Sequence, residues 1–274
     1  MQHTSINGIS TEHLSVMDRG LQYGDGLFET IACVDGNLQF CDEHIERMQK
    51  GAERLLIDSN TIRFFNDDVS TLRQKHNIDN CIVKLMLTRG PGERGYRSPI
   101  KQKVTRIVTI SDLPEYPEIF YKDGVDACIC QHPVSTNVRL AGIKHLNRLD
   151  NVMARSEWKD EFQEGLMLDE SGNLIEGTMS NVFSVKNNVL MTPSLEHCGV
   201  NGIIRDQILS IAREQGIKTV VTNMKIAELK EMDELFVCNS VIGVWPVKNI
   251  NANTYQVGPF TQQLAKALQQ VIQN

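Results

Sequence analysis

Apolar residues recur at helical spacing in several segments of the chain. In one of them the apolar positions are Ile45, Met48, Ala52 and Leu55. This spacing predicts a helix, with Asp42 as its N-cap. The same periodicity predicts helices over residues 62–72, over 203–215 with an end at Gly216, and at the C-terminus.

A further long helix is expected to begin near His145. Its apolar positions at helical spacing are Leu146, Leu149, Val152 and Met153. A stripe of this kind is expected to face a core.

Short runs rich in β-branched and aliphatic residues predict strands at Cys81–Thr88, Lys103–Ile110 and Val125–Cys130. Further strands are expected at residues 166–168, 174–176, 182–185 and 235–238. Turns are expected at Glu170–Gly172 and Asn187–Asn188, where Gly and Asn favour a reversal of the chain.

The order of these elements predicts an α/β protein of the α+β type with two domains. Residues 1–112 are expected to form a small N-terminal α/β domain. Residues 113–121, which contain two prolines and several aromatic residues, are expected to be a linker. Residues 122–274 are expected to form a larger C-terminal domain with a β-rich core, and a ligand site is expected between the two domains.

The composition is that of a globular protein, because 41% of the 274 residues are hydrophobic. Lys and Arg number 28 against 34 Asp and Glu, so the net charge of −6 provides no overall basic field for nucleic acid or an anionic membrane. No apolar run approaches the roughly 20 residues that span a bilayer, and residues 1–10 lack the apolar core of a signal peptide. We therefore expect a cytoplasmic protein that binds neither nucleic acid nor membrane.

The seven cysteines are scattered and include no C-x-x-C pair. We expect reduced, mostly buried thiols. Cys128 and Cys130 would share one face of a strand, but no second pair of His or Cys residues lies at ligand spacing. We therefore expect no metal site.

Gly90, Gly92 and Gly95 match the G-x-G-x-x-G fingerprint of dinucleotide-binding proteins. That fingerprint requires a helix to open at the motif. Here Pro91 lies inside the motif and the next expected element is a strand, so we reject dinucleotide binding.

The long loop Arg89–Gln102 carries two arginines and a tyrosine near its glycines. Arg94, Tyr96 and Arg97 suit a mobile flap that binds an anion. An ordinary connection between two strands is the alternative.

Three further features are weak when taken singly. Lys144 is flanked by apolar residues, which would favour a nucleophilic amine, although a solvated lysine is the ordinary explanation. Glu176 is expected at a strand end, where carboxylates are usually solvated. The loop 199–202 runs into a helix whose free amides suit a phosphate, although most helix N-termini bind nothing.

Taken together, these features resemble the fold-type IV pyridoxal-phosphate enzymes, and among them the lyases that act on 4-amino-4-deoxychorismate. The resemblance spans nearly the whole chain. The segments that carry it, in order, are Asp18–Thr30, His44–Met48, Arg89–Tyr96, Ala141–Arg148, Glu176–Phe183, Gly199–Arg205 and Cys238–Ser240.

The resemblance implies pyridoxal 5'-phosphate as the cofactor. Lys144 would hold it as an internal aldimine and later act as acid and base. Glu176 would keep the pyridine nitrogen protonated, so that the ring is an electron sink. Arg47 would bind the phosphate. The other residues expected to bind the cofactor are Ile203, Ile204, Ser240 and Asn181.

The implied reaction converts 4-amino-4-deoxychorismate to 4-aminobenzoate and pyruvate, a step of folate biosynthesis. It would proceed through an external aldimine, removal of the C4 proton by Lys144 and an aromatising elimination. Arg94, Tyr96 and Arg97 would bind the substrate carboxylates. Thr30 would position Lys144 or the leaving group.

Two other functions remain open from the sequence. Cofactor residues shared across the family allow a D-amino acid or branched-chain transaminase, although Leu149 stands where branched-chain transaminases carry Tyr. The other alternative is a non-enzymatic module that binds a nucleotide or a partner protein through the glycine loop. The resemblance also implies a homodimer and allows a transient contact with aminodeoxychorismate synthase.

Overall fold

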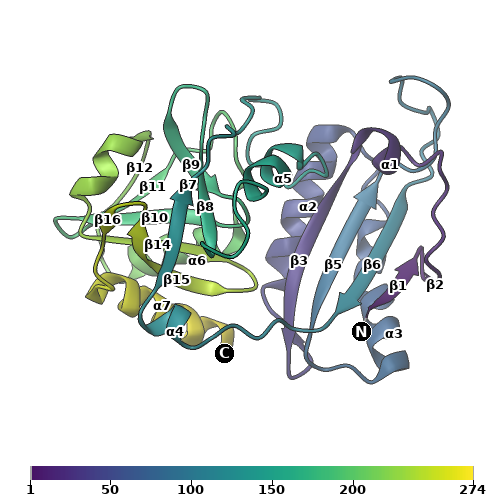
Figure 1. Ribbon diagram of the computed structural model, residues 1–274. Helices are drawn as coiled ribbons and strands as arrows, with labels where there is room; N and C mark the ends of the chain where they lie inside the picture. The colour runs from purple at the N-terminus through teal and green to yellow at the C-terminus, as the bar shows by residue number, and fades with distance from the viewer. Residues whose placement is uncertain (1, 274) are drawn as a thin grey trace. The chain divides into compact units, whose positions relative to one another are not determined.

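The computed structural model describes residues 2–273, which fold as two compact units (Figure 1). Unit 1 consists of the chain up to Pro114 together with Ile143–Asn147. Unit 2 consists of Glu115–Gly142 and the chain from Arg148 onward. The division after Pro114 falls inside the segment 113–121 that was expected to be a linker.

Unit 1 is built on an antiparallel sheet with the strand order β2-β1-β6-β5-β3-β4. Two longer helices cover one face of this sheet (Figure 1). The elements in chain order are β1 (His3–Ile6), β2 (Ile9–Ser10), α1 (Arg19–Tyr23), β3 (Gly26–Val34), β4 (Asn37–Leu38), α2 (Cys41–Leu55), the 3₁₀ helix η1 (Ile62–Phe64), α3 (Phe65–His76), β5 (Cys81–Thr88) and β6 (Thr105–Ser111).

The core of unit 1 follows from strand alternation. On β5, Val83, Leu85 and Leu87 are at most 1% exposed, whereas Lys84, which points to the other face, is half-buried. The buried side chains pack with Phe65 of α3 and with other apolar residues of the two helices. The strand predicted at Cys81–Thr88 is thereby confirmed.

Helix α2 begins differently from the expectation. Its N-cap is Phe40, with a left-handed φ of 53° and no capping hydrogen bond from its side chain, so the prediction of Asp42 as N-cap was wrong. Asp42 instead lies in the first turn, where its charge is favourable next to the positive end of the helix. The helix buries Met48 and Ala52 and approaches β3 closely at Gly51.

Unit 2 contains a mixed sheet with the order β12-β11-β10-β14-β15-β7-β8-β9-β13, and β16 pairs with β15. Phe183 and Phe236, stacked with ring centroids 5.0 Å apart, and Trp245 lie in its interior. The elements are α4 (Ile119–Lys122), β7 (Val125–Ile129), α5 (Leu149–Arg155), β8 (Glu164–Leu168), β9 (Asn173–Gly177), β10 (Asn181–Lys186), β11 (Val189–Pro193), α6 (Ile203–Glu214), β12 (Thr219–Thr222), β13 (Met224–Lys225), the 3₁₀ helix η2 (Ile226–Glu231), β14 (Glu234–Asn239), β15 (Gly243–Ile250), β16 (Asn253–Thr254) and α7 (Pro259–Gln273).

The long helix expected from His145 was wrong. Residues 143–147 are extended and belong to unit 1, and helix α5 begins only at Leu149 and has seven residues. The stripe is not a core face either, since Leu149 is 76% exposed and Val152 57% exposed. The helical periodicity was misleading here because the edge of β3 forms hydrogen bonds with this segment and holds it extended.

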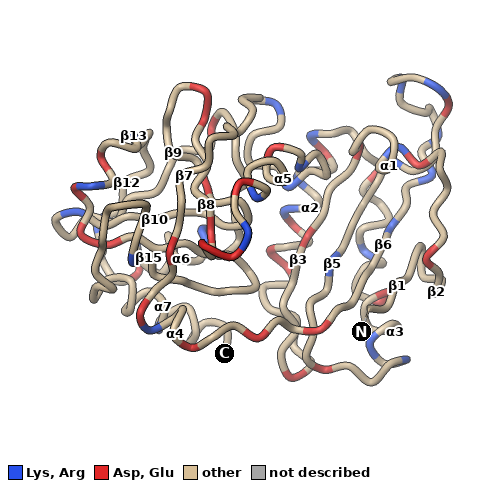
Figure 2. Tube along the Cα trace, viewed as in Figure 1, with Lys and Arg blue, Asp and Glu red and all other residues tan. Residues whose placement is uncertain are grey.

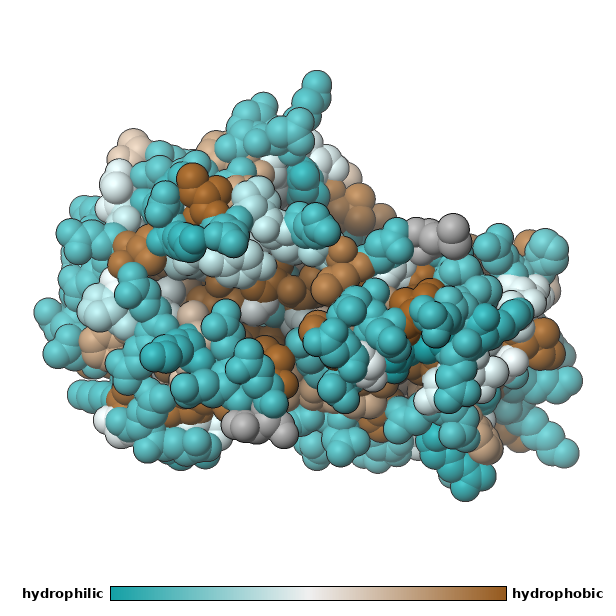
Figure 3. All heavy atoms as spheres, turned by 90° about the horizontal axis from the view of Figure 1, so that it is seen from below, coloured by the Kyte–Doolittle hydropathy of each residue, from teal (hydrophilic) through white to brown (hydrophobic). Residues whose placement is uncertain are grey.

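The face in Figure 3 is mostly hydrophilic, with hydrophobic residues showing in small areas. Within residues 2–273, no helix combines the length and the apolar character needed to cross a membrane.

Candidate functional site

Lys144 lies on an extended segment that is hydrogen-bonded to the start of β3. The Phe28 amide donates to the Lys144 carbonyl at 3.0 Å, and the Leu146 amide donates to the Gly26 carbonyl at 3.0 Å. A side chain at Gly26 would clash with the Leu87 carbonyl and meet Leu146, so this close approach requires glycine. Strand β3 therefore fixes the backbone of Lys144.

Lys144 and Thr30 lie on the same side of β3. The Lys144 Nζ is 4.4 Å from the centre of the Phe28 ring, whose face attracts an ammonium group. Thr30 follows Phe28 by two residues and therefore faces the same side, roughly 7 Å further along the strand. Lys84, which pairs with Thr30 from β5, also reaches the Phe28 ring, with its Nζ 5.2 Å from the ring centre.

Arg47 on α2 is held by a buried carboxylate on β3. Its Nε donates to Glu29 Oε1 at 2.8 Å, and a terminal guanidinium nitrogen donates to Glu29 Oε2. The same Oε2 bonds His44 Nδ1 at 2.6 Å. The side chains of Glu29 and His44 are each 1% exposed, and that of Arg47 is 12% exposed. This bidentate ion pair with Glu29 fixes the Arg47 guanidinium in one orientation.

The charges of this cluster are coupled. Burial acts to raise the pKa of the Glu29 carboxyl, but the Arg47 charge and the hydrogen bonds from His44 and Arg47 outweigh it and lower the pKa. Burial lowers the pKa of His44, the bond to Glu29 opposes this, and the positive charges of Arg47 and Lys144 lower the pKa further. The arrangement fits an ionised Glu29 and a neutral His44 that donates from Nδ1. Lys144 and Arg47 thus belong to one electrostatic environment.

In unit 2, Glu176 lies beneath the loop that precedes α6. Its carboxylate, on a residue that is 4% exposed, accepts a hydrogen bond from the Val200 amide at 2.7 Å. Gly199 has a left-handed φ of 84°, and a side chain there would come within 3.3 Å of the Glu176 carboxylate. The loop can therefore close over Glu176 only with glycine at this position.

The same loop holds Gly142, two residues ahead of Lys144 in the chain. The Gly142 amide donates to the Gly199 carbonyl at 2.8 Å, and the Asn201 amide donates to the Gly142 carbonyl at 3.2 Å. The loop that covers Glu176 thus also fixes the backbone at Gly142.

Asn181 binds the loop at the start of α6. Its Nδ2 donates to the Val200 carbonyl at 2.9 Å, and a Cβ at Gly202 would clash with the Asn181 side chain. Gly202 is the N-cap of α6 and gives no capping bond from a side chain. The amides of Ile203 and Ile204, in the first turn, are the ones that suit an anion at such a helix end.

Ser240 lies in the turn after β14, close to Asn181 along the sheet. Asn181 pairs with Cys238, and the Asn239 side chain ties this turn to the Met179 carbonyl at 3.0 Å. The structure thus brings Asn181, Ser240 and the start of α6 into one region of unit 2.

These residues supply the donor set that a pyridoxal phosphate needs. The helix N-terminus at Gly202 has no side-chain cap of its own, and Arg47 provides a fixed guanidinium, so both suit a phosphate group. Glu176 is a buried carboxylate suited to a pyridinium nitrogen, and Lys144 provides an amine. The chemistry of the residues therefore fits the cofactor.

The expected flap is a loop whose side chains face solvent. Tyr96 is 84% exposed, and Arg94 and Arg97 are exposed as well. The loop extends beyond the strands β5 and β6 in Figure 1 and carries basic residues in Figure 2. No helix follows the glycines, which agrees with the rejection of a dinucleotide site.

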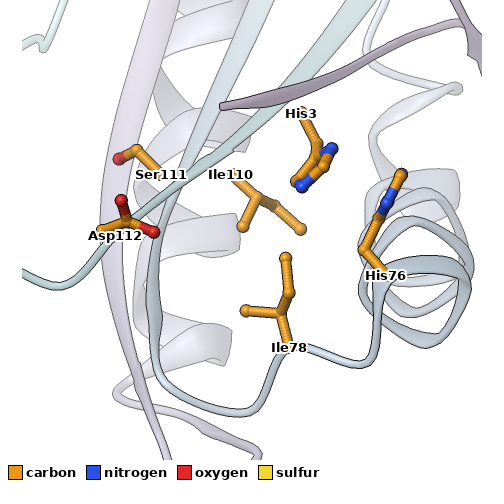
Figure 4. A pocket seen from close by; sticks show the side chains of 6 residues that line it. All are labelled: His3, His76, Ile78, Ile110, Ser111 and Asp112. Carbon is orange, nitrogen blue, oxygen red and sulfur yellow. The ribbon is translucent and has the colours of Figure 1, made fainter. Parts of the chain in front are cut away.

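A separate pocket of about 210 Å³ lies elsewhere on unit 1 (Figure 4). The rings of His3 and His76 stack across it with centroids 3.6 Å apart. Its other lining residues are Ile78, Ile110, Ser111 and Asp112. Because β6 and β5 separate β1 from β3 in the sheet, this pocket is not part of the Lys144 region.

Several buried titratable residues near the candidate site were not singled out in the sequence. Glu29 and His44 orient Arg47, and Glu164 shapes the loop between Glu176 and Asn181 by accepting bonds from Thr178 Oγ1 and Ser180 Oγ, each at 2.6 Å. The three-residue spacing of His44 and Arg47 on one helix face was the only signal available for the first group. No local pattern marked Glu164.

Comparisons with known proteins show which family the chain is similar to. The model of the family described as amino-transferase class IV matches residues 26–250. An aminodeoxychorismate lyase of Vibrio harveyi is 32% identical over 265 residues, covering 94% of this chain and 97% of the relative. A putative branched-chain-amino-acid aminotransferase of Methanocaldococcus jannaschii is 34% identical over 265 residues, covering 94% and 91%.

A solved structure is also similar throughout. The 4-amino-4-deoxychorismate lyase from Pseudomonas aeruginosa superposes with a TM-score of 0.93 at 37% identity, covering 97% of this chain and 98% of that one. The mixed α/β fold with two sheets is the one expected from the sequence, and the enzymes of this class use pyridoxal phosphate. The chain therefore belongs to the class IV aminotransferase family of fold-type IV pyridoxal-phosphate enzymes.

Proposed function

We propose that this enzyme is a lyase that converts 4-amino-4-deoxychorismate to 4-aminobenzoate and pyruvate. The observation that carries the proposal is the similarity to the Pseudomonas lyase over almost the full length of both chains. The position of Thr30 on the Lys144 side of β3 supports it, because the resemblance assigns a threonine there to lyases of the family.

We assign the cofactor contacts to two sets of residues. Lys144 would hold the cofactor covalently, and Arg47, fixed by Glu29, would bind the phosphate together with the first amides of α6 and the Ser240 hydroxyl. Asn181 would shape this phosphate site by holding the Val200 carbonyl. Glu176, held by the Val200 amide, would face the pyridine nitrogen.

In this assignment the Lys144 amine transfers the proton. When bound, pyridoxal phosphate withdraws the electrons left behind as a proton is removed beside the substrate amine. Lys144 Nζ takes that proton from C4 of the substrate, and Thr30 orients the amine or the leaving side chain. Loss of the side chain makes the ring aromatic, which provides much of the driving force. The protein mainly positions groups and moves protons.

The proposed substrate carries one carboxylate on its ring and a second on the side chain that is eliminated. Arg94 and Arg97 offer guanidinium groups for them on the loop after β5, and Tyr96 offers a hydroxyl. All three side chains are exposed and can therefore meet a ligand without first breaking a buried contact.

The test is product formation from substrate made in situ from chorismate, glutamine and a synthase. We expect the purified protein to form 4-aminobenzoate and pyruvate in equal amounts, and the Lys144→Ala variant to form neither. A yellow, cofactor-loaded protein that yields no product would refute the lyase assignment.

A transaminase is the second candidate, and the Methanocaldococcus relative favours it. Its signature is a change in the cofactor spectrum to the pyridoxamine form on adding D-alanine or L-isoleucine. Such a change together with an absence of 4-aminobenzoate would establish this alternative. Absence of any change would exclude it.

We further propose that the enzyme is a homodimer. Helix α5 of unit 2 leaves Leu149, Val152 and Met153 between 54% and 76% exposed, and a second copy of the chain would cover this apolar surface. Analytical ultracentrifugation should give a dimer, and Val152→Glu should shift it towards the monomer. A contact with the synthase would be transient, and co-sedimentation at micromolar concentration should show no stable complex.

A further inference from the structure

Arg19, the first residue of α1, is a charged residue that is only 4% exposed. A buried guanidinium is costly unless its N–H groups are all paired. Arg19 Nε donates to Asp25 Oδ2 at 2.8 Å, and its terminal nitrogens donate to the carbonyls of Gly95 at 3.0 Å and Tyr96 at 3.1 Å. The Arg97 carbonyl lies 3.5 Å from the same group. Three consecutive carbonyls of the loop therefore converge on one side chain.

The loop is shaped to fit around Arg19. A Cβ at Gly92 would come within 2.9 Å of Arg19 Cδ, so the loop passes over the arginine stem only because residue 92 is glycine. The ring of Tyr23 lies 5.0 Å from the guanidinium on α1, and the Tyr96 ring lies 5.3 Å from that of Tyr23. Contact with Arg19 thus explains the glycine at position 92.

Arg19 is in turn tied to the helix that carries Arg47. Asp25 accepts from Arg19 and also from Arg89, whose Nε lies 2.8 Å from Oδ2 and whose terminal nitrogen lies 3.0 Å from Oδ1. Arg89 also donates to the carbonyls of Leu55 and Leu56 at the end of α2, at 2.7 and 2.6 Å. The loop is therefore anchored to the rigid part of unit 1.

Arg19 binds the backbone of the loop, while the side chains of the loop point outward. The carbonyls of residues 95–97 point to Arg19, whereas the side chains of Arg94, Tyr96 and Arg97 are exposed. We propose that Arg19 is a positioning residue that holds this loop in the conformation in which Arg94 and its neighbours bind substrate carboxylates. The substrate part of this inference rests on the proposed function.

The loop conformation can be measured without any activity, because trypsin cuts after arginine. In Arg19→Met the stem over Gly92 is kept but the N–H donors are lost. We expect cleavage after Arg94 and Arg97 to be at least tenfold faster than in the wild type. Arg73→Met is the matched control, because Arg73 likewise binds two carbonyls, those of Ile78 at 3.0 Å and Gly36 at 2.9 Å, away from the loop.

Kinetics should separate positioning from folding. For the Arg19→Met holoenzyme we expect KM for the substrate to rise about tenfold, or roughly 1.4 kcal/mol, with kcat and the cofactor spectrum nearly unchanged. Arg19→Lys keeps a positive charge beside Asp25 but cannot bind three carbonyls at once. It should give intermediate values of both the cleavage rate and KM. It serves as the test if the methionine variant does not fold.

The outcomes distinguish the inference from the proposed function. Cleavage after Arg94 and Arg97 at the wild-type rate in both Arg19 variants would overturn the positioning role. Faster cleavage with an unchanged KM would overturn the link between the loop and the substrate. If the wild type has no lyase activity, the proposed function fails, whereas the cleavage comparison still decides whether Arg19 holds the loop.

Discussion

The substitution Glu29→Gln tests the buried cluster that orients Arg47. It keeps the size of the side chain but removes the charge paired with Arg47, and it changes the acceptor of the His44 bond. Breaking a buried ion pair costs about 3–5 kcal/mol, and we expect the lower end because the Arg47 side chain is 12% exposed and can recruit water. A loss of about 3 kcal/mol corresponds to a fall in Tm of roughly 6–12 °C for a protein of this size.

The assay is calorimetric unfolding of the cofactor-free protein. Glu46→Gln is the matched control on α2, because Glu46 forms an exposed pair with Lys50 at 2.8 Å. We expect the control to change stability by less than about 0.5 kcal/mol. Equal Tm values for Glu29→Gln and Glu46→Gln would refute the idea that the buried ion pair between Glu29 and Arg47 stabilises the fold.

The same variant should also bind the cofactor less tightly, and the loss should come from the phosphate group alone. If Glu29 acts by orienting Arg47 toward a phosphate, affinity for pyridoxal phosphate should fall about tenfold in Glu29→Gln. Affinity for pyridoxal, which lacks the phosphate, should not change. Equal losses for both compounds would mean that the cluster stabilises the fold rather than the phosphate site.

Three other substitutions test separate parts of the account. Glu176→Gln should retain the cofactor but lose at least about 100-fold in turnover, because a neutral pyridine is a poor electron sink; steady-state kinetics with absorption spectra would check this. Gly202→Ala should weaken pyridoxal phosphate binding about tenfold in equilibrium dialysis, because the new methyl group would clash with Asn181 at the start of α6. For Asp25, burial acts to raise the carboxyl pKa, but the bonds and charges of Arg89 and Arg19 lower it below the ordinary 3.8. Its ionised form therefore stabilises the fold above that pH and ceases to do so as the pH falls through the lowered value. The stability difference between wild type and Asp25→Asn, measured by urea unfolding, should shrink between about pH 5 and pH 3; a difference that stays constant would contradict the ionised pair.

Elements with strong local signals could be predicted from the sequence. The strand Cys81–Thr88 alternates between a core and an outer face. Helix α6 ends at Glu214, and Gly216, which was expected to end it, lies two residues further on with a left-handed φ of 67°. Asn187 and Asn188 both have positive φ, at 49° and 62°, which is what a tight hairpin turn between β10 and β11 requires.

Features decided by distant partners could not be predicted in this way. The segment after Gly142 has helical periodicity, yet it is extended because β3 has a free edge there. Arg19, Glu29 and Glu164 look like surface charges in the sequence, and only the three-dimensional arrangement pairs them in the interior. The cofactor roles proposed for Lys144 and Glu176 come from the family resemblance, since a lone lysine or a strand-end glutamate is not distinctive.

The most direct test of the central claim is to identify the lysine that holds the cofactor. The structure places two lysines at the Phe28 ring, Lys144 at 4.4 Å and Lys84 at 5.2 Å. Borohydride reduction of the holoenzyme followed by peptide mass spectrometry should find the cofactor mass on the peptide containing Lys144 and none on that containing Lys84. Label on Lys84, or on any lysine other than Lys144, would contradict the account.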